Sequence, residues 1–123
     1  MAGSAMTFTE YRLGTVKKLK VAWTSDSATG AVSGTSTYEY EGRLIGAITV
    51  PGTAGDQPSD NYDIAVNDAD SVDVALGALA NRDELNTEFV AEASMAGLAN
   101  SKITVAVTAA GNSKKGTIYL FIR

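Results

Sequence analysis

The chain has 123 residues, of which 45% are hydrophobic and 20% charged, and it contains neither cysteine nor histidine. Its length suits one domain, its composition is that of a globular protein, and the two missing residue types exclude thiol nucleophiles, disulfides and the commonest zinc ligands. There is no run of about eighteen apolar residues and no secretory signal, so we expect neither a membrane span nor export.

The charges are segregated along the chain. Residues 1–50 carry a net charge of +1, residues 51–101 carry −9 and residues 102–123 carry +4, which gives the overall −4. The basic residues are few and lack interleaved aromatics, which argues against nucleic acid as a partner. We expect the opposite charges to complement one another within one fold or between neighbouring copies.

Residues 1–14 are predicted to form an N-terminal arm, because they show no sustained alternation. Their aromatic residues, Phe8 and Tyr11, suggest that the arm docks on its own domain or on a partner. Residues 1–5 could have been added by the expression vector, with Met6 as the natural start. Residues 15–123 are expected to form a single β domain.

The first strand is predicted within residues 15–24, where Leu19, Val21 and Trp23 alternate with polar residues and should face the core. Residues 25–36 are rich in Ser, Thr, Gly and Ala and are expected to form a turn or an exposed loop. Residues 38–50 are β-prone. They fit either two strands or one long strand bent at Gly42 and Gly46.

Residues 51–61 hold both prolines and should form a loop. Tyr62, Ile64 and Val66 then share one face of a strand. Residues 72–79 fit a strand or a short helix equally well, and for residues 85–93 we favour a strand in the first half.

The last two strands are predicted at residues 103–108 and 117–122, joined as a β-hairpin by a turn at residues 111–116. The second is apolar on both faces, so it should be central in a sheet or covered by a neighbouring molecule. Six to eight short strands with little helix predict an all-β fold, an antiparallel β-sandwich or barrel that is jelly-roll-like. Its exposed edges would be covered by oligomerisation or by docking on a larger assembly.

The acidic segment offers a weak candidate metal site, with Asp68, Asp70 and Asp73 as the carboxylates that could bind calcium. An EF-hand loop that starts at Asp68 would need Gly and Glu where Asp73 and Leu79 stand, so that pattern fails. We therefore favour carboxylates that form Asx turns and cap the segment that follows. No cofactor is expected.

The sequence shows no catalytic constellation. It lacks the Gly-x-Ser-x-Gly elbow, the Ser-x-x-Lys motif and the phosphate-binding Gly-x-x-x-x-Gly-Lys loop, so we do not expect an enzyme. Tyr38, Tyr40 and Tyr62 could instead line an aromatic platform for a carbohydrate, although tyrosines in a core or an interface are the commoner case.

A set of short motifs resembles the small virion structural proteins of tailed bacteriophages and prophages. Ser71 stands where that pattern has Gly. The motifs are Val50-Pro51, Tyr62-Asp63-Ile64, Asp68, Asp73-Val74, Gly77, Asn81-Arg82, Gly111-Asn112-Ser113 and Gly116-Thr117-Ile118-Tyr119. The resemblance extends from about Thr15 to the end. It implies a capsid decoration (cement) protein on the virion surface, made in the host cytoplasm, with the major capsid protein and other copies of itself as partners.

Two alternatives remain open, a head-to-tail connector or tail component and a carbohydrate-binding β-sandwich. On the decoration reading we expect a homo-oligomer, a dimer or trimer, on the particle. The arm and the basic strand would then contact the capsid, through Phe8, Tyr11, Arg12, Lys17, Lys18 and Lys20.

Overall fold

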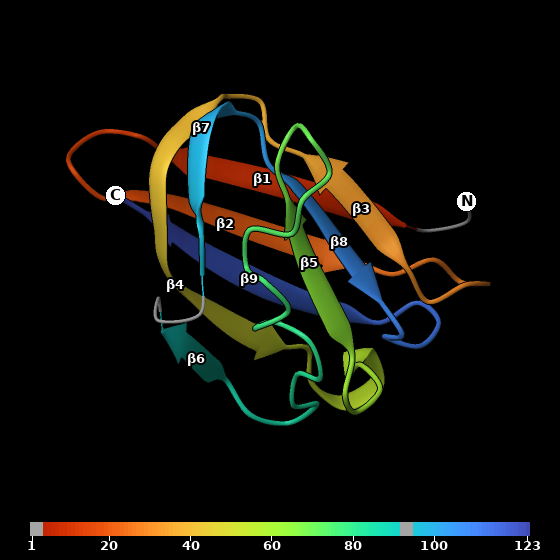
Figure 1. Ribbon diagram of the computed structural model, residues 1–123. Coiled ribbons are helices and arrows are strands. Elements are labelled where there is room, and N and C mark those ends of the chain that lie inside the picture. The colour runs from red at the N-terminus through yellow and green to blue at the C-terminus, as the bar shows by residue number, and fades with distance from the viewer. Residues whose placement is uncertain (1–3, 92–94) are drawn as a thin grey trace.

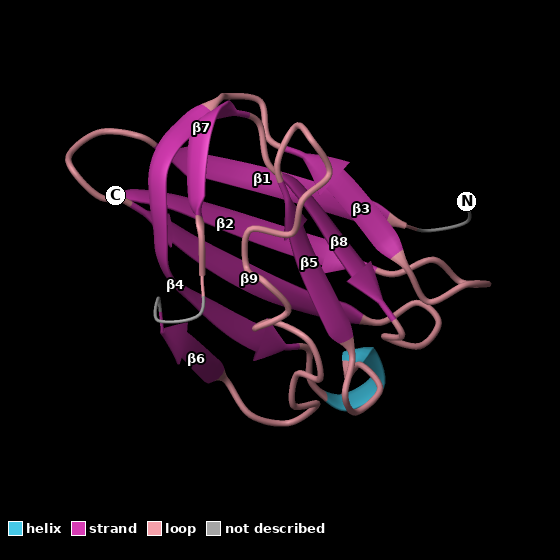
Figure 2. Cartoon of the chain, in the orientation of Figure 1, coloured by secondary structure: helices cyan, strands magenta, loops and turns pink. Residues whose placement is uncertain are grey.

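The computed structural model describes residues 4–91 and 95–123, and most of its regular structure is β-strand (Figure 2). Loops and a short 3-10 helix, η1 (Ala54–Asp56), connect the strands. The strands are β1 (Ala5–Tyr11), β2 (Lys17–Thr24), β3 (Val32–Thr35), β4 (Tyr40–Pro51), β5 (Asp63–Asn67), β6 (Glu88–Ala91), β7 (Gly97–Ser101), β8 (Thr104–Thr108) and β9 (Lys115–Ile122).

The strands form two antiparallel sheets that pack against each other (Figure 1). The larger sheet has the order β1-β2-β9-β4-β6, and β7 also pairs with β4; the smaller sheet has the order β3-β8-β5. Among the described residues no strand of one sheet pairs with a strand of the other. The fold is therefore a sandwich, as predicted, and not a closed barrel.

The order of pairing is that of a jelly roll. Strand β2 pairs with β9, β3 with β8, and β4 with β7 and β6, so early strands pair with late ones in nested fashion. The innermost pair consists of β5 and the segment 73–82. Isolated bridges join Asn67 of β5 to Asp73, and Tyr62, which directly precedes β5, to Arg82. β1 lies outside this scheme as an added edge strand. The jelly-roll-like prediction is confirmed, and the chain alternates between the two sheets as it winds.

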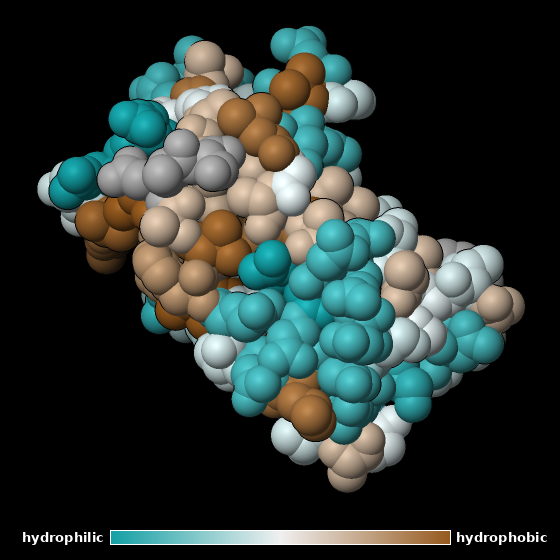
Figure 3. Space-filling view, turned by 60° about the horizontal axis from the view of Figure 1, so that its bottom comes forward, coloured by the Kyte–Doolittle hydropathy of each residue, from teal (hydrophilic) through white to brown (hydrophobic). Residues whose placement is uncertain are grey.

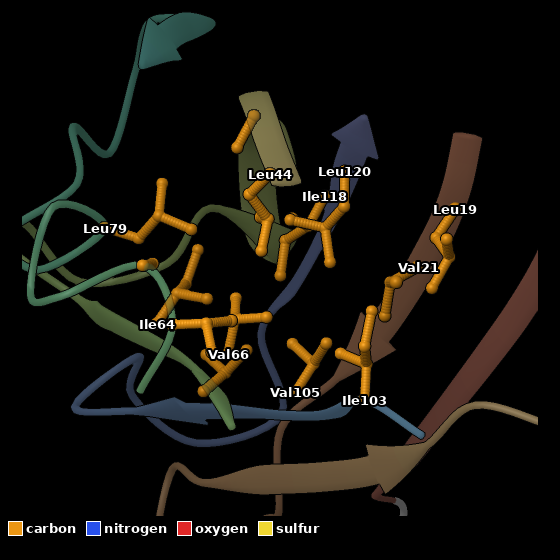
Figure 4. Close-up of a cluster of buried hydrophobic side chains, with 14 of the residues drawn as sticks. Leu19, Val21, Leu44, Ile64, Val66, Leu79, Ile103, Val105, Ile118 and Leu120 are labelled. Atoms are coloured by element: carbon orange, nitrogen blue, oxygen red, sulfur yellow. The ribbon is translucent and has the colours of Figure 1, made fainter. Parts of the chain in front are cut away.

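The core lies between the sheets and is filled by alternate residues of each strand (Figure 4). Leu19 and Val21 of β2 face Val105 of β8 and Val66 of β5 across it. Trp23 completes the β2 row and is 2% exposed, so its predicted place in the core is confirmed.

Strand β4 is one long strand with two irregularities, which was one of the two alternatives. Its register shifts between Tyr40 and Gly42 when it pairs with β7 and between Leu44 and Gly46 when it pairs with β9. Gly42 has φ +123°. A Cβ there would lie 2.6 Å from the carbonyl oxygen of Arg123, so the bend requires glycine.

The prediction of an exposed loop at residues 25–36 was wrong in two ways. Residues 32–35 form β3, and Ser25, Asp26 and Ser36 are buried. The Ser25 hydroxyl donates to the Gly111 carbonyl (2.6 Å) and accepts from the Lys114 N–H (2.8 Å). A polar loop can be buried when its side chains replace water as hydrogen-bond partners.

The predicted C-terminal β-hairpin was also wrong. Strands β8 and β9 exist close to the predicted residues, but β8 lies in the smaller sheet and β9 in the larger one. The segment that joins them crosses from sheet to sheet. β9 does lie centrally, between β2 and β4, which was one of the two predicted alternatives, and its inward side chains are buried in the core.

The middle of the chain contains less regular structure than we expected. Residues 72–79 form turns, neither strand nor helix, although Val74, Ala75 and Leu79 are buried. The strand expected in the first half of residues 85–93 lies later, as β6 at residues 88–91. Residues 92 and 93 of that segment, and residues 1–3 of the predicted arm, lie outside the described residues.

The segment that we expected to be an N-terminal arm contributes a strand. Residues 5–11 form β1, which pairs with β2 along its whole length, so this segment docks on its own domain. Met6, Phe8 and Glu10 point inward, and Met6 and Phe8 reach Gly34 of β3, where a Cβ would lie 3.1 Å from either side chain. The alternation is hard to recognise in the sequence because the third inward position, Glu10, is charged.

Candidate interaction surfaces

The acidic segment after β5 uses its carboxylates to hold turns. Asp73 accepts three backbone hydrogen bonds of 3.0 Å, with Oδ1 from Val66 and Ala75 and with Oδ2 from Gly77. Asp68 Oδ1 accepts from the N–H groups of Asp70 (2.9 Å) and Val72 (3.0 Å). These are the capping and Asx-turn contacts that we favoured over a metal site.

Asp68, Asp70 and Asp73 are not brought together as metal ligands. Within residues 4–91 and 95–123, no three acidic side chains form a group that could hold a metal ion. Ser71, which replaces the Gly of the resembling pattern, has φ +62°. This is the left-handed conformation that glycine adopts most readily, and a serine adopts it here.

The tyrosines proposed as a carbohydrate platform do not share a surface. Tyr40 is 3% exposed and Tyr62 is 1% exposed, so both belong to the core, and Tyr38 alone of the three is exposed. The Tyr62 ring packs against Trp23, with ring centroids 5.7 Å apart, and burial raises the pKa of its hydroxyl to about 12. The core position, which was expected to be the commoner case, holds for Tyr40 and Tyr62, so the three tyrosines form no common platform.

The loop between β1 and β2 projects beyond the sheet and is unusually apolar (Figure 1). We call Tyr11, Arg12, Leu13, Gly14, Thr15 and Val16 the β1–β2 tip. Leu13 is 96% exposed, and Tyr11 and Val16 are also exposed. Basic groups lie beside them, since the Arg12 guanidinium stacks 3.5 Å from the Tyr38 ring centroid and the Lys18 ammonium lies 4.7 Å from that of Tyr11.

Glu10 anchors the base of the tip to β4 and to the loop that precedes β4. Its carboxylate accepts hydrogen bonds from the Tyr40 hydroxyl (2.6 Å) and from the N–H groups of Thr37 (2.9 Å) and Tyr38 (3.3 Å). Burial alone would raise the pKa of this carboxyl. The hydrogen bond from Tyr40 and those from the two backbone N–H groups outweigh burial and hold the pKa of Glu10 below its ordinary value.

This lowered pKa predicts how stability depends on pH. The Glu10 contribution is fully present above the ordinary pKa of 4.5 and is lost as the pH falls through the lower folded value. We therefore expect the melting temperature of the wild type to fall more steeply than that of Glu10→Gln below about pH 4. Thermal melts from pH 7 to pH 2 would show this, and parallel curves for the two proteins would contradict it.

The side of the larger sheet that faces away from the core forms a second apolar surface. We call it the outer face. The pairing register of the strands places Lys20, Tyr119, Ile48 and Phe89 in one row across β2, β9, β4 and β6. The neighbouring row contains Tyr11, Lys18 and Phe121. Phe89 is 64% exposed and lies over Gly46, where a Cβ would come within 2.9 Å of its ring.

The outer face is basic in an acidic protein. Lys18, Lys20 and Lys115 point from it. Glu10 and Glu88 lie on the inward side of their strands, and among the described residues of the larger sheet the carboxylate that alternation places outward is Glu41, where β4 pairs with β7. Beyond the aromatic rows the surface is hollowed, with a volume of about 320 Å³ over small residues such as Thr7, Ala22 and Thr117. An apolar, positively charged face of this kind is typical of an interaction surface.

The predicted contact residues fall into three groups. Phe8 points inward and packs against the core, so it is not available to a partner. Tyr11 and Arg12 belong to the β1–β2 tip, with Lys17 at its base, and Lys18 and Lys20 lie on the outer face. Sequence reasoning missed Leu13, Ile48, Phe89, Tyr119 and Phe121. The outward positions of the alternating strands could have revealed all of these except Leu13.

Comparison of the chain with protein-family models, with curated proteins and with solved structures finds no match. In the part of the chain that the structure describes, no helix is long and apolar enough to cross a membrane.

Proposed function

We propose that this chain is a non-enzymatic structural protein of a virion, which binds a phage capsid as a decoration (cement) protein. The proposal combines the motif resemblance with a physical feature of the fold. That feature is a rigid β body that presents an apolar tip to a partner. Jelly rolls serve many functions, among them capsid and lectin domains, so the fold alone does not select this one.

The single observation that carries the proposal is the exposure of Leu13 at the end of the β1–β2 tip. A leucine that is 96% exposed, with Tyr11 and Val16 exposed beside it, leaves apolar area in water that a partner can cover. Arg12 and Lys17 lie next to it and share a hollow with Glu39 and Glu41. The tip therefore suits a capsid surface that offers an apolar pocket edged by polar and charged groups.

The tip is held in position before it binds. The Glu10 hydrogen bonds fix its base, and the stacking of Arg12 on Tyr38 fixes one flank. A base and a flank that are already held in place lower the conformational cost of binding.

Copy number on the particle tests the proposal and separates it from its alternatives. Cryo-electron microscopy of the phage that encodes this chain should show hundreds of copies on the head. Rings of six or twelve copies would instead identify a connector or tail component, and absence from purified particles would overturn a role in the virion. The carbohydrate-binding alternative has lost the tyrosine platform on which it rested.

Substitution of the tip tests where the contact lies. We expect Leu13→Ser to bind at least about tenfold more weakly to capsids that have been prepared without the protein, because burial of a leucine contributes roughly 1.5–3 kcal/mol. Occupancy can be measured by adding purified protein back to such particles. Leu76→Ser is the matched control, since Leu76 is also exposed but lies in the acidic segment.

Full occupancy by Leu13→Ser would remove the tip from the contact. A point substitution is cleaner than deletion of residues 1–13, because the deletion would also remove β1 from the sheet.

A further inference from the structure

A turn at one margin of the larger sheet complements the outer face of that sheet in both charge and hydrophobicity. Residues 83–86, which we call the Leu85 turn, precede β6 at the sheet edge opposite β1 (Figure 1). Leu85 is 69% exposed there and follows Asp83 and Glu84. The outer face offers the reverse combination, apolar rings with lysines.

The end of the sandwich around the Leu85 turn keeps an excess of negative charge. Figure 3, which turns this end forward, shows hydrophilic residues gathered on it. Arg82 pairs with Glu88 at 3.4 Å, and the Lys114 ammonium donates to the Gly55 carbonyl at 3.1 Å. The carboxylates of this region are Asp56, Asp60, Asp83, Glu84 and Glu88.

Hydrogen bonds hold the Leu85 turn in its projecting conformation. Asp83 accepts from the Leu85 N–H (3.2 Å) and from the Asn86 side-chain amide (2.6 Å). The Gln57 side chain donates to Glu84 at 2.8 Å and ties the turn to the segment that follows η1. The turn is therefore ordered before it meets a partner, which lowers the entropic cost of binding.

The lysines of the outer face form no ion pairs with carboxylates of the described residues. Lys20 makes no ion pair with any described residue, and Lys18 contacts the rings of Tyr11 and Tyr119 at 4.7 and 5.8 Å from their centroids. Two copies that met outer face to outer face would bring Lys18, Lys20 and Lys115 of each copy against a surface whose strands carry one described carboxylate, Glu41, which disfavours a two-fold pairing of this surface.

We propose that the Leu85 turn of one copy docks on the outer face of the next copy, near Lys18 and Lys20. The turn lies beyond β6, and the lysines lie on β2 next to the β1 edge, so the contact joins opposite margins of the same sheet. Such a contact is heterologous: it repeats from copy to copy and generates a ring where the rotation between copies closes, and an open row where it does not. This goes beyond the proposed binding to a capsid and does not depend on it.

Exchange of charge between the two surfaces tests the contact. The face variant carries Lys18→Glu and Lys20→Glu, and the turn variant carries Asp56→Lys and Asp60→Lys, which leaves Asp83 and Glu84 in place to hold the turn. By sedimentation velocity at about 50 mM salt, where screening is weak, the wild type should associate with increasing concentration. Each variant alone should associate at least about tenfold more weakly, because like charges then meet.

Mixing the two variants should restore association, because each then offers the charge that the other lacks. Leu85→Ser should weaken wild-type association about tenfold through the lost apolar contact, and Leu76→Ser should not change it. Matching melting temperatures would show that the variants are folded.

The contact would be overturned by a wild type that stays monomeric at about 1 mM protein in low salt, where even weak electrostatic contacts form. A mixture that associates no better than either variant would overturn it as well. A monomeric protein that still coats particles would remove this contact and leave the proposed function standing, whereas association without any presence on particles would do the reverse.

Discussion

Trp23→Ala is expected to lower the free energy of unfolding by about 3–5 kcal/mol, the largest effect of any substitution considered. The side chain is 2% exposed and lies between the two sheets. Its ring packs on Gly116, where a Cβ would lie 2.6 Å from the ring, and against Tyr62. Because Gly116 offers no side chain that could fill the space, the cavity left by alanine would persist. Urea unfolding followed by circular dichroism measures the change.

Trp23→Phe separates the loss of volume from the loss of the indole N–H. That N–H is buried and has no hydrogen-bond partner among the described residues. Phenylalanine removes the unsatisfied donor and keeps most of the apolar contact, so we expect a loss below about 1.5 kcal/mol. An alanine variant as stable as the wild type would show that Trp23 does not fill the core. A phenylalanine variant as unstable as alanine would show that the N–H has a partner.

Alternation along single strands predicted the core well. Leu19, Val21 and Trp23 on β2 and Ile118 and Leu120 on β9 are all buried, because a half-buried strand must place every second side chain inward whatever its partner. The bends of β4 at Gly42 and Gly46 were also predictable, since glycine in a strand marks irregular pairing.

Pairing between strands was less predictable, because it depends on contacts that are distant in sequence. The last two strands looked like a hairpin, yet each pairs with strands from the first half of the chain. The buried Ser25 side chain holds the crossing segment in place through hydrogen bonds to residues 111 and 114. A single serine in a polar loop gives no sign of this role in the sequence.

The candidate surfaces were only partly predictable for a related reason. Alternation with Leu19 and Val21 predicted that Lys18 and Lys20 point away from the core, and they do lie on the outer face. Ile48, Phe89 and Tyr119 were not recognised, because an apolar residue on a strand is first assigned to the core. Only the register of four strands shows that these side chains share a row on the opposite side.

Asp73→Ala is expected to destabilise the fold by about 2–3 kcal/mol, even though Asp73 is half exposed and lies in a loop. Its carboxylate accepts from three backbone N–H groups, those of Val66 in β5 and of Ala75 and Gly77 in the turn. Alanine would leave these donors without a partner, and the Val66 N–H lies in the core region, where water replaces the carboxylate poorly. The segment it holds carries the buried Val74 and Leu79, so the loss extends to the packing against β5.

Asp73→Asn is the control that distinguishes hydrogen bonding from charge. An asparagine oxygen can still accept from Val66 and Ala75, but its amide would face the Gly77 N–H donor to donor, so we expect an intermediate loss of about 1 kcal/mol. Asp70→Ala removes a carboxylate of the same segment that is exposed and caps no turn in the described residues, and it should change stability by less than about 0.5 kcal/mol. If Asp70→Ala and Asp73→Ala unfolded at the same urea concentration, the carboxylates would act only through the total charge of the segment. A larger loss of stability for Asp73→Ala than for Asp70→Ala would mean that the Asp73 carboxylate organises this acidic segment by capping its backbone N–H groups.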